Sequence, residues 1–160
     1  MVIVGLDVGN ARIGVAMCDE LEIIASPHSV VPRVPAARAL DAIRQVVETT
    51  GAGMLVVGLP VSFDGRLHGQ AQSVLAFARR LRAVVSAPMV FVDESLSTVT
   101  AEDRLRVAGV RADRMRERID AVAAAVILDD YITNRRTVPD ALIEASRRGT
   151  DSATLADNDM

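Results

Sequence analysis

Apolar runs alternate along the chain with segments that are apolar on one side only, a pattern that predicts a mixture of strands and helices. Near-continuous apolar runs are typical of strands buried on both faces of a sheet, and apolar residues at every third or fourth position are typical of helices. We therefore expect strands at 2–8, 12–18, around 22–26, 54–60 and 88–93. Helices are expected at 36–49, after residue 69, at about 98–108 and at about 114–133.

The order of these elements restricts the fold. Short turns join the first three strands, which predicts an antiparallel meander. Each of the two later strands follows a helix, and right-handed connections would place both parallel to the first strand. This is an α/β fold, a ribonuclease H-like mixed five-stranded sheet with helices on both faces. The carboxyl ends of the first, fourth and fifth strands would then meet at one rim, where open α/β sheets place their sites.

The composition is that of one domain with an acidic end. Half of the 160 residues are apolar, but no run has the length of a membrane span and the first residues lack the pattern of a signal peptide. Cys18 is the only cysteine, which excludes an internal disulfide and favours a cytoplasmic location. We expect a domain at 1–136 and a mobile tail at 137–160. The tail holds five acidic residues and two arginines, and thus the whole net charge of −3.

Acidic residues stand at three places that this fold would bring together. Asp7 ends the first apolar strand, where it either caps the following turn or meets a positive charge. The fifth strand ends in Asp93 and Glu94, which could also only solvate a loop and a helix start. Asp120 shares a side of the last helix with Ala123, Ala124 and Ile127, and therefore faces the sheet.

A divalent cation would explain this convergence. Mg²⁺ and Mn²⁺ take oxygen ligands, and sites that cleave phosphodiesters commonly hold two such ions. We therefore expect Asp7, Glu94 and Asp120 to be catalytic residues and to bind Mg²⁺ or Mn²⁺, with two ions in the site. Gly5 lies on the same face of its strand as Asp7, and Gly14 on the second strand could leave room beside them.

The basic residues, all eighteen of them arginines, are the candidates for contacts with nucleic acid. Six arginines and only two acidic residues lie between 104 and 118, which indicates either a solvated helix face or a surface for phosphates. The loop at 60–69 also offers His68, but it could equally be a simple connection. The residues expected to contact nucleic acid are Arg12, Arg66, Arg111, Arg114, Arg116 and Arg118.

Four successive motifs resemble those of the YqgF/RuvX family: "GLDVGNARIGVA", "VVGLPVSFDGR", "VDESLSTVTAEDRL" and "IDAVAAAVILDDYI". They extend from about residue 2 to residue 132. The resemblance implies a fold similar to that of the RuvC Holliday-junction resolvases. It also implies nuclease activity, with a proposed role in maturing the 5′ end of the precursor of 16S rRNA. By resemblance the metal-ligand role falls to Asp7, Glu94 and Asp120, with Asp93 in a supporting role.

One position departs from the family pattern. Ser95 stands where the family usually has an arginine, so a guanidinium that could contact a phosphate is missing. Arg12 or an arginine of the 104–118 segment could replace it.

Other functions stay open at this stage. The chain could be a Holliday junction resolvase acting on branched DNA, for which a symmetric dimer would be expected. It could also be a nucleic-acid-binding or ribosome-assembly module without catalysis. An actin-like ATPase or sugar kinase shares this core but needs two such domains. We expect precursor rRNA or branched DNA as the partner, no membrane, and a monomer or weak homodimer.

Overall fold

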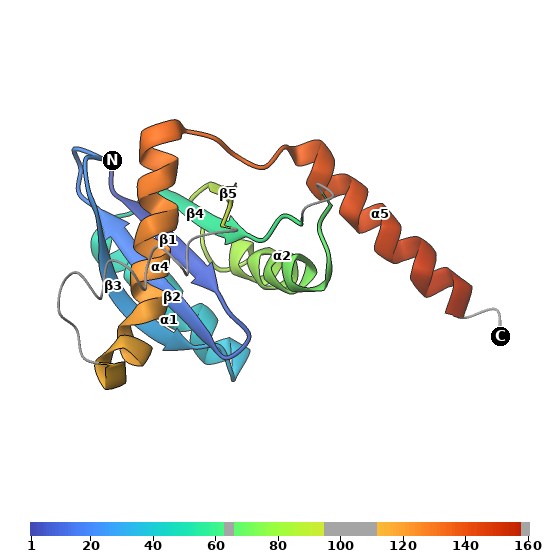
Figure 1. Cartoon of the computed structure of the whole chain (residues 1–160), viewed down its shortest axis with the longest axis horizontal. Helices are drawn as coiled ribbons and strands as arrows, with labels where there is room; N and C mark the ends of the chain where they lie inside the picture. Colours follow the sequence, from blue (N-terminus) through green and yellow to red (C-terminus); the bar gives the residue numbers. More distant parts are fainter. Residues whose placement is uncertain (63–65, 95–111, 158–160) are drawn as a thin grey trace.

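The computed structural model describes residues 1–62, 66–94 and 112–157, except for the side chains of 112–117 and 149–157. Five strands and four helices lie in these ranges (Figure 1). In chain order they are β1 (Ile3–Val8), β2 (Arg12–Cys18), β3 (Ala25–Pro32), α1 (Ala36–Thr50), β4 (Met54–Leu59), α2 (Gly69–Arg82), β5 (Met89–Asp93), α4 (Ala112–Asn134) and α5 (Asp140–Asp157). The helix expected at 98–108 lies outside the described residues.

The strands form one mixed sheet in the order β3-β2-β1-β4-β5. β2 pairs antiparallel with both β1 and β3, whereas β4 lies parallel to β1 and β5 parallel to β4. The predicted meander and the predicted parallel strands are therefore confirmed. As a consequence, the carboxyl ends of β1, β4 and β5 lie side by side at one rim.

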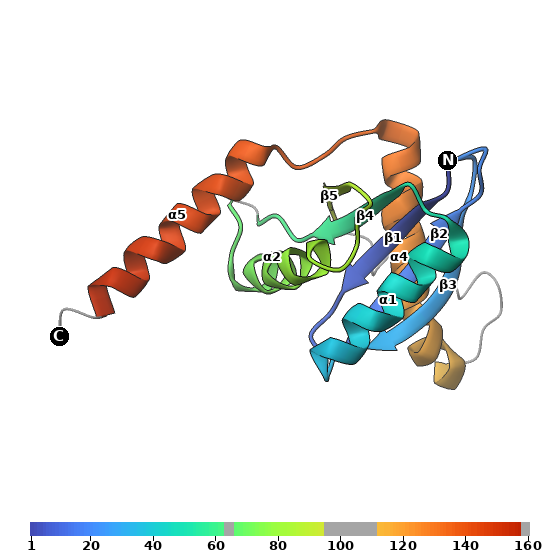
Figure 2. The same cartoon turned by 180° about the vertical axis from the view of Figure 1, so that it is seen from behind.

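Helices cover both faces of the sheet, as expected. α4 crosses one face over β1, β2 and β3 (Figure 1), and α1 and α2 lie on the other (Figure 2). The central strand β1 needs this cover because Ile3, Val4 and Leu6 are completely buried. Among the described residues, two main apolar clusters result, one under α4 and a larger one under α1 and α2, and a small third cluster lies around Val122 and Ala123 of α4.

Glycines on three strands allow α4 to approach the sheet closely. A Cβ atom on Gly5 would lie 2.9 Å from Cβ of Leu128, and one on Gly14 would overlap the carbonyl oxygen of Asp120. The sequence suggested that Gly14 leaves room beside Asp7; in the structure the space at both glycines is occupied by α4. The structure also adds Gly58 on β4, where a Cβ atom would lie 2.6 Å from Cδ1 of Ile127.

The third strand was predicted at the wrong place. The apolar residues around 22–26 indicated a strand there, but β3 begins at Ala25 and continues to Pro32. Leu21, Ile23 and Ile24 instead lie in the connection before β3 with exposed side chains. The prediction failed because β3 is an edge strand, where prolines and polar residues are tolerated.

Helix α5 lies in the segment expected to be an acidic tail. The backbone N–H of Val138 donates a hydrogen bond to the carbonyl of Phe91 on β5, over 2.7 Å. Val138 and Ile143 are buried in the cluster under α2. Beyond these contacts α5 extends away from the sheet (Figure 1). The boundary at residue 136 and the mobility of the tail remain predictions.

Among the described residues, no helix is both long and apolar enough to cross a membrane.

Candidate active site

The carboxyl groups of Asp7 and Glu94 face each other at the rim where β1 and β5 end. Asp7 is the fifth of the six residues of β1, and Glu94 directly follows β5. The parallel order β1-β4-β5 brings them together, and the backbone N–H of Glu94 donates to the carbonyl of Leu59 on the intervening strand. A hydrogen bond joins the two carboxyl groups. Two of the three predicted metal ligands are therefore neighbours.

This pair lies in an environment that disfavours negative charge. Burial raises the pKa of Glu94 to about 9, with further contributions from the charge of Asp7, its hydrogen bond and the charge of Asp93. The pKa of Asp7 is also raised, by burial and by the charge of Asp120, although the hydrogen bond with Glu94 opposes the shift. At neutral pH the pair therefore retains a proton.

Asp120, the third predicted ligand, lies beside the pair but is bound to an arginine. Gly14 is directly paired with Asp7 in the sheet, and the backbone of Asp120 packs on Gly14. The side chain of Asp120 accepts a hydrogen bond from Nε of Arg12, over 2.8 Å. Among the described residues, the positive charge near Asp7 is that of Arg12, which is bonded to Asp120 and not to Asp7 itself.

A hard divalent cation fits the donors at this rim. Glu94 Oε2 is buried and has no hydrogen-bond partner among the described residues. A Cβ atom on Gly58 would lie 2.5 Å from it, so the glycine makes room for this oxygen. The side chains that the described residues bring together here, Asp7, Glu94 and Asp120, carry carboxylate oxygens, the ligands that Mg²⁺ and Mn²⁺ prefer. The described part of the chain holds no ready cluster of three metal-binding side chains, however. In this conformation Asp120 is held by Arg12.

An arginine that the sequence analysis missed holds the turn after Asp7. The guanidinium of Arg33 donates to the carbonyl of Gly9 over 2.9 Å, and to the carbonyl and hydroxyl of Ser73 on α2 over 3.0 and 2.8 Å. It also lies over the ring of Phe77, 5.6 Å from the centroid. Arg33 thereby joins the β1–β2 turn to helix α2, whose residue Ser73 lies forty positions after Arg33 in the chain. The local sequence carries no signal for so remote a partner.

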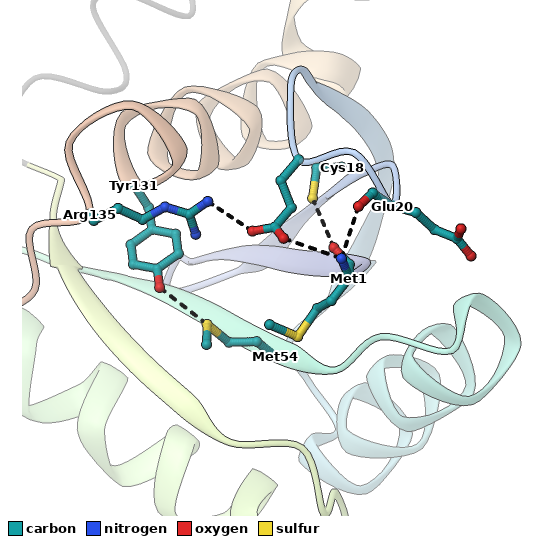
Figure 3. Close-up of polar contacts among 7 residues, drawn as sticks. Met1, Cys18, Glu20, Met54, Tyr131 and Arg135 are labelled. Atoms are coloured by element: carbon teal, nitrogen blue, oxygen red, sulfur yellow. Dashed lines mark hydrogen bonds and ion pairs between the residues drawn. The ribbon is translucent and has the colours of Figure 1, made fainter.

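The far end of α4 is fixed by a separate group of contacts (Figure 3). Arg135 donates to Oε1 of Glu22 over 2.8 Å and lies over the ring of Tyr131. The hydroxyl of Tyr131 in turn lies 3.4 Å from the sulfur of Met54 on β4. With Gly14 at one end and these contacts at the other, α4 has a defined position on the sheet, and so has the backbone of Asp120.

The residues predicted to contact nucleic acid are only partly described. Arg12 and Arg118 are exposed on the α4 side of the sheet. Arg66 is exposed in the loop after β4, where its carbonyl accepts a hydrogen bond from the N–H of Ser62. Ser95, Arg111 and the side chains of Arg114 and Arg116 lie outside the described residues, so their expected roles stay predictions.

Comparison with known proteins identifies the family. The model of the RuvX family, described as "Holliday junction resolvase", matches residues 1–134. The chain belongs to the RuvX family. A relative from Chloroflexus aggregans, named "Putative pre-16S rRNA nuclease", is 42% identical over 134 residues, which are 84% of this chain and 94% of the relative. A protein of the same name from Gloeobacter violaceus is 42% identical over 134 residues, 84% of this chain and 85% of that protein.

Solved structures show the same fold at low sequence identity. RuvC from T. thermophilus, in complex with a Holliday junction substrate, superposes with a TM-score of 0.56 at 19% identity, covering 87% of this chain and 99% of RuvC. A Fowlpox virus resolvase in complex with Holliday junction DNA gives 0.52 at 9% identity, covering 84% and 99%. The ribonuclease H-like fold expected from the order of the elements is confirmed.

Proposed function

We propose that this RuvX protein is a divalent-cation-dependent nuclease that hydrolyses phosphodiester bonds in the 5′-end processing of precursor 16S rRNA. The observation that carries the proposal is the buried Asp7–Glu94 pair with its unpartnered oxygen, at the rim where α/β sheets place their sites. The family and the names of the relatives support nucleic acid as the substrate.

The residues of the chain would divide the work as follows. Asp7 and Glu94 would hold the cation, whose positive charge would make the burial of the two carboxylates tolerable. Asp120 would complete the ligand set from α4. A divalent cation held by these residues would supply activation of the attacking water and stabilisation of the leaving oxygen. The exposed guanidinium groups of Arg12, Arg66 and Arg118 would bind the phosphates of the strand.

Neutralising Asp7 tests the proposal. Asp7→Asn removes a ligand charge and should lower cleavage of a precursor 16S rRNA fragment by at least about a hundredfold, judged by general magnitudes for catalytic groups. RNA affinity measured without divalent cation should change little, because the phosphates are bound by arginines. Cleavage is measured on gels and affinity by fluorescence anisotropy.

Asp19→Asn is the matched control, since Asp19 is exposed at the opposite end of the sheet. It should behave as the wild type in both assays. Near-normal cleavage by Asp7→Asn, or an equal loss in both variants, would refute the assignment of the site.

A second candidate function is resolution of branched DNA, which the description of the family model favours. Cleavage of a four-way DNA junction and of precursor rRNA, compared at equal protein concentration, separates the two. A resolvase needs two sites for two strands and hence a dimer, whereas trimming of one RNA end needs no symmetry. We propose a monomer or weak homodimer, and sedimentation measures this directly.

A further inference from the structure

Arg12 and Asp120 form an ion pair between the two functional groups of the site. Arg12 is one of the expected phosphate contacts, and Asp120 is one of the expected metal ligands. Nε of Arg12 lies 2.8 Å from Oδ2 of Asp120, and the two side chains are 56% and 23% exposed. Nε of Arg12 and Oδ2 of Asp120 are thus engaged with each other, so a phosphate that takes this N–H, or a cation that takes this carboxylate, competes with the ion pair.

The sheet fixes where Asp120 can go when this pair opens. Arg12 and Gly14 lie on the same face of β2, and Gly14 is paired with Asp7. The backbone of Asp120 packs directly on Gly14 and has no room to shift toward the sheet. Because Gly14 is the direct sheet partner of Asp7, this packing places Asp120 beside Asp7. With its backbone held in this way, Asp120 would change its partner from Arg12 to the Asp7–Glu94 pair by rotation of its side chain.

Electrostatics decides whether the Asp120 side chain prefers Arg12 or the Asp7–Glu94 pair. Without a cation, a third carboxylate beside Asp7 and Glu94 would be repelled, and pairing with Arg12 is favoured. A cation held by Asp7 and Glu94 would invert the sign of the local field and attract Asp120. A phosphate near Arg12 competes for the guanidinium, because it can accept two hydrogen bonds from it where Asp120 accepts one from Nε.

We propose that the Arg12–Asp120 pair is a switch that couples nucleic-acid binding to completion of the cation site. A backbone phosphate takes Arg12, and the release of Asp120 adds the third carboxylate to Asp7 and Glu94. Conversely, cation binding withdraws Asp120 and frees Arg12 for a phosphate. The switch rests on the proposed function, since it needs both a cation and a nucleic acid at this rim.

The coupling has a defined size. The cation and the RNA each compete with the Arg12–Asp120 pair when they bind alone. When both bind, the pair is broken only once, so each ligand strengthens the binding of the other. Exposed ion pairs have a modest strength, which corresponds to a factor of about two to five in affinity. The effect of RNA on cation affinity and the effect of the cation on RNA affinity must be equal.

Titration of Mn²⁺ into the full chain, followed by the electron paramagnetic resonance of free Mn²⁺, tests the switch without an activity assay. It is performed with and without a short RNA, whose integrity is checked on a gel. Arg12→Ala should bind Mn²⁺ about two- to fivefold more tightly than wild type in the absence of RNA, and the increase in affinity caused by RNA should shrink by the same factor. Arg12→Gln serves as a second variant, and thermal unfolding confirms that both are folded.

Arg118→Ala is the matched control. Arg118 is an exposed arginine two residues before Asp120 and makes no ion pair with the described part of the chain. Its removal changes the local field by the same charge but breaks no contact to Asp120. The switch predicts that Arg12→Ala raises the Mn²⁺ affinity measured without RNA by more than Arg118→Ala does. It also predicts that Arg12→Ala reduces the RNA-induced increase in that affinity by more.

The outcomes separate the switch from the function on which it rests. Equal effects of Arg12→Ala and Arg118→Ala, or weaker Mn²⁺ binding by Arg12→Ala, would overturn the switch. In the latter case Arg12 would be a positioning residue that orients Asp120 toward the cation. If wild type binds Mn²⁺ no better than Asp7→Asn does, the proposed function fails, and the switch fails with it.

Discussion

Glu94 is held in a setting that opposes its own ionisation. Its carboxyl is buried beside Gly58, faces Asp7 and has one oxygen without a partner among the described residues. The pKa of about 9 that results keeps the group protonated at neutral pH in the absence of a cation. Keeping this carboxyl protonated so far above its ordinary pKa lowers the stability of the folded protein at neutral pH. Strongly shifted carboxyl groups of this kind are typical of functional sites.

The stability of the cation-free protein should therefore depend on pH through Glu94. Its folded-state pKa is raised from 4.5 to about 9, so its contribution is fully present below pH 4.5 and is lost as pH rises toward 9. Glu94→Gln is neutral at every pH and should flatten this loss, leaving the variant more stable than wild type at pH 9. Thermal unfolding in EDTA between pH 6 and pH 9 measures the difference.

Glu48→Gln on α1 provides the comparison, because Glu48 is exposed and pairs only with its helical neighbour Arg44 among the described residues. Its unfolding temperature should follow wild type across the range. A Glu94→Gln profile parallel to that of wild type would mean that Glu94 is not buried against Asp7 in solution.

Gly14 is the residue on which the position of Asp120 depends most directly. In Gly14→Ala the new methyl group would overlap the backbone of Asp120, which belongs to a helix and cannot yield locally. We expect the free energy of unfolding to fall by about 1–3 kcal/mol, the usual cost of overpacking. Urea denaturation measures it. Gly69→Ala, at a glycine with open space around its Cα, should cause no loss, and equal effects would contradict the close packing of α4 on β2.

At the scale of elements, much of the fold could be predicted because local pattern and burial agree. β1, β2, β4 and β5 are apolar runs between turns, and α1 has a clear apolar side, so the predicted and observed bounds differ by few residues. β3 was misplaced because the exposed Leu21, Ile23 and Ile24 resemble a buried strand in sequence, whereas the real strand holds prolines at a sheet edge. Exposure at an edge is a property of the sheet and not of the segment.

The site shows the same difference between what a segment indicates by itself and what depends on the assembled sheet. That Asp7 and Glu94 meet follows from the parallel order of their strands, which the sequence of elements predicts. The partner of Asp120 could not be predicted in this way. Arg12 is 108 residues distant in sequence, and the contact depends on how α4 crosses β2. Arg33, with its contacts to Gly9 and Ser73, was missed for the same reason.

The packing of α5 on the sheet edge leads to a prediction at this scale. Ile143 is 7% exposed in the cluster under α2, so Ile143→Ala should lower the free energy of unfolding by about 2–3 kcal/mol, the low end of the range for such truncations. Urea denaturation measures this too. Arg148→Ala, at an exposed position of the same helix, should change it little. No difference between the two variants would favour the expected mobile tail and a domain that ends near residue 136.

For the whole molecule, the net charge of −3 says little about binding because the charges are unevenly placed. Much of the acidic excess lies after residue 136, whereas Arg12, Arg66 and Arg118 are exposed on the rim or the α4 side. The opposite face, covered by α1 and α2, also has exposed arginines, among them Arg38 on α1. An RNA strand bound at the rim beside Asp7 and Glu94 should therefore contact the arginines on the rim and on the α4 side, and not those on the face covered by α1 and α2.

Arg66→Ala and Arg38→Ala test this placement, since each removes one exposed arginine. Arg66 follows β4 at the active rim, and its loss of a phosphate contact should lower the dependence of log affinity on log salt by about one unit, whatever the sequence of the RNA. Arg38→Ala should leave that slope unchanged. Both are measured by fluorescence anisotropy at several salt concentrations, with Asp7→Asn as the background so that the RNA stays intact. Because the two substitutions alter the net charge equally, equal slopes would mean that the strand does not pass over the loop at 60–69, and that this loop is a simple connection.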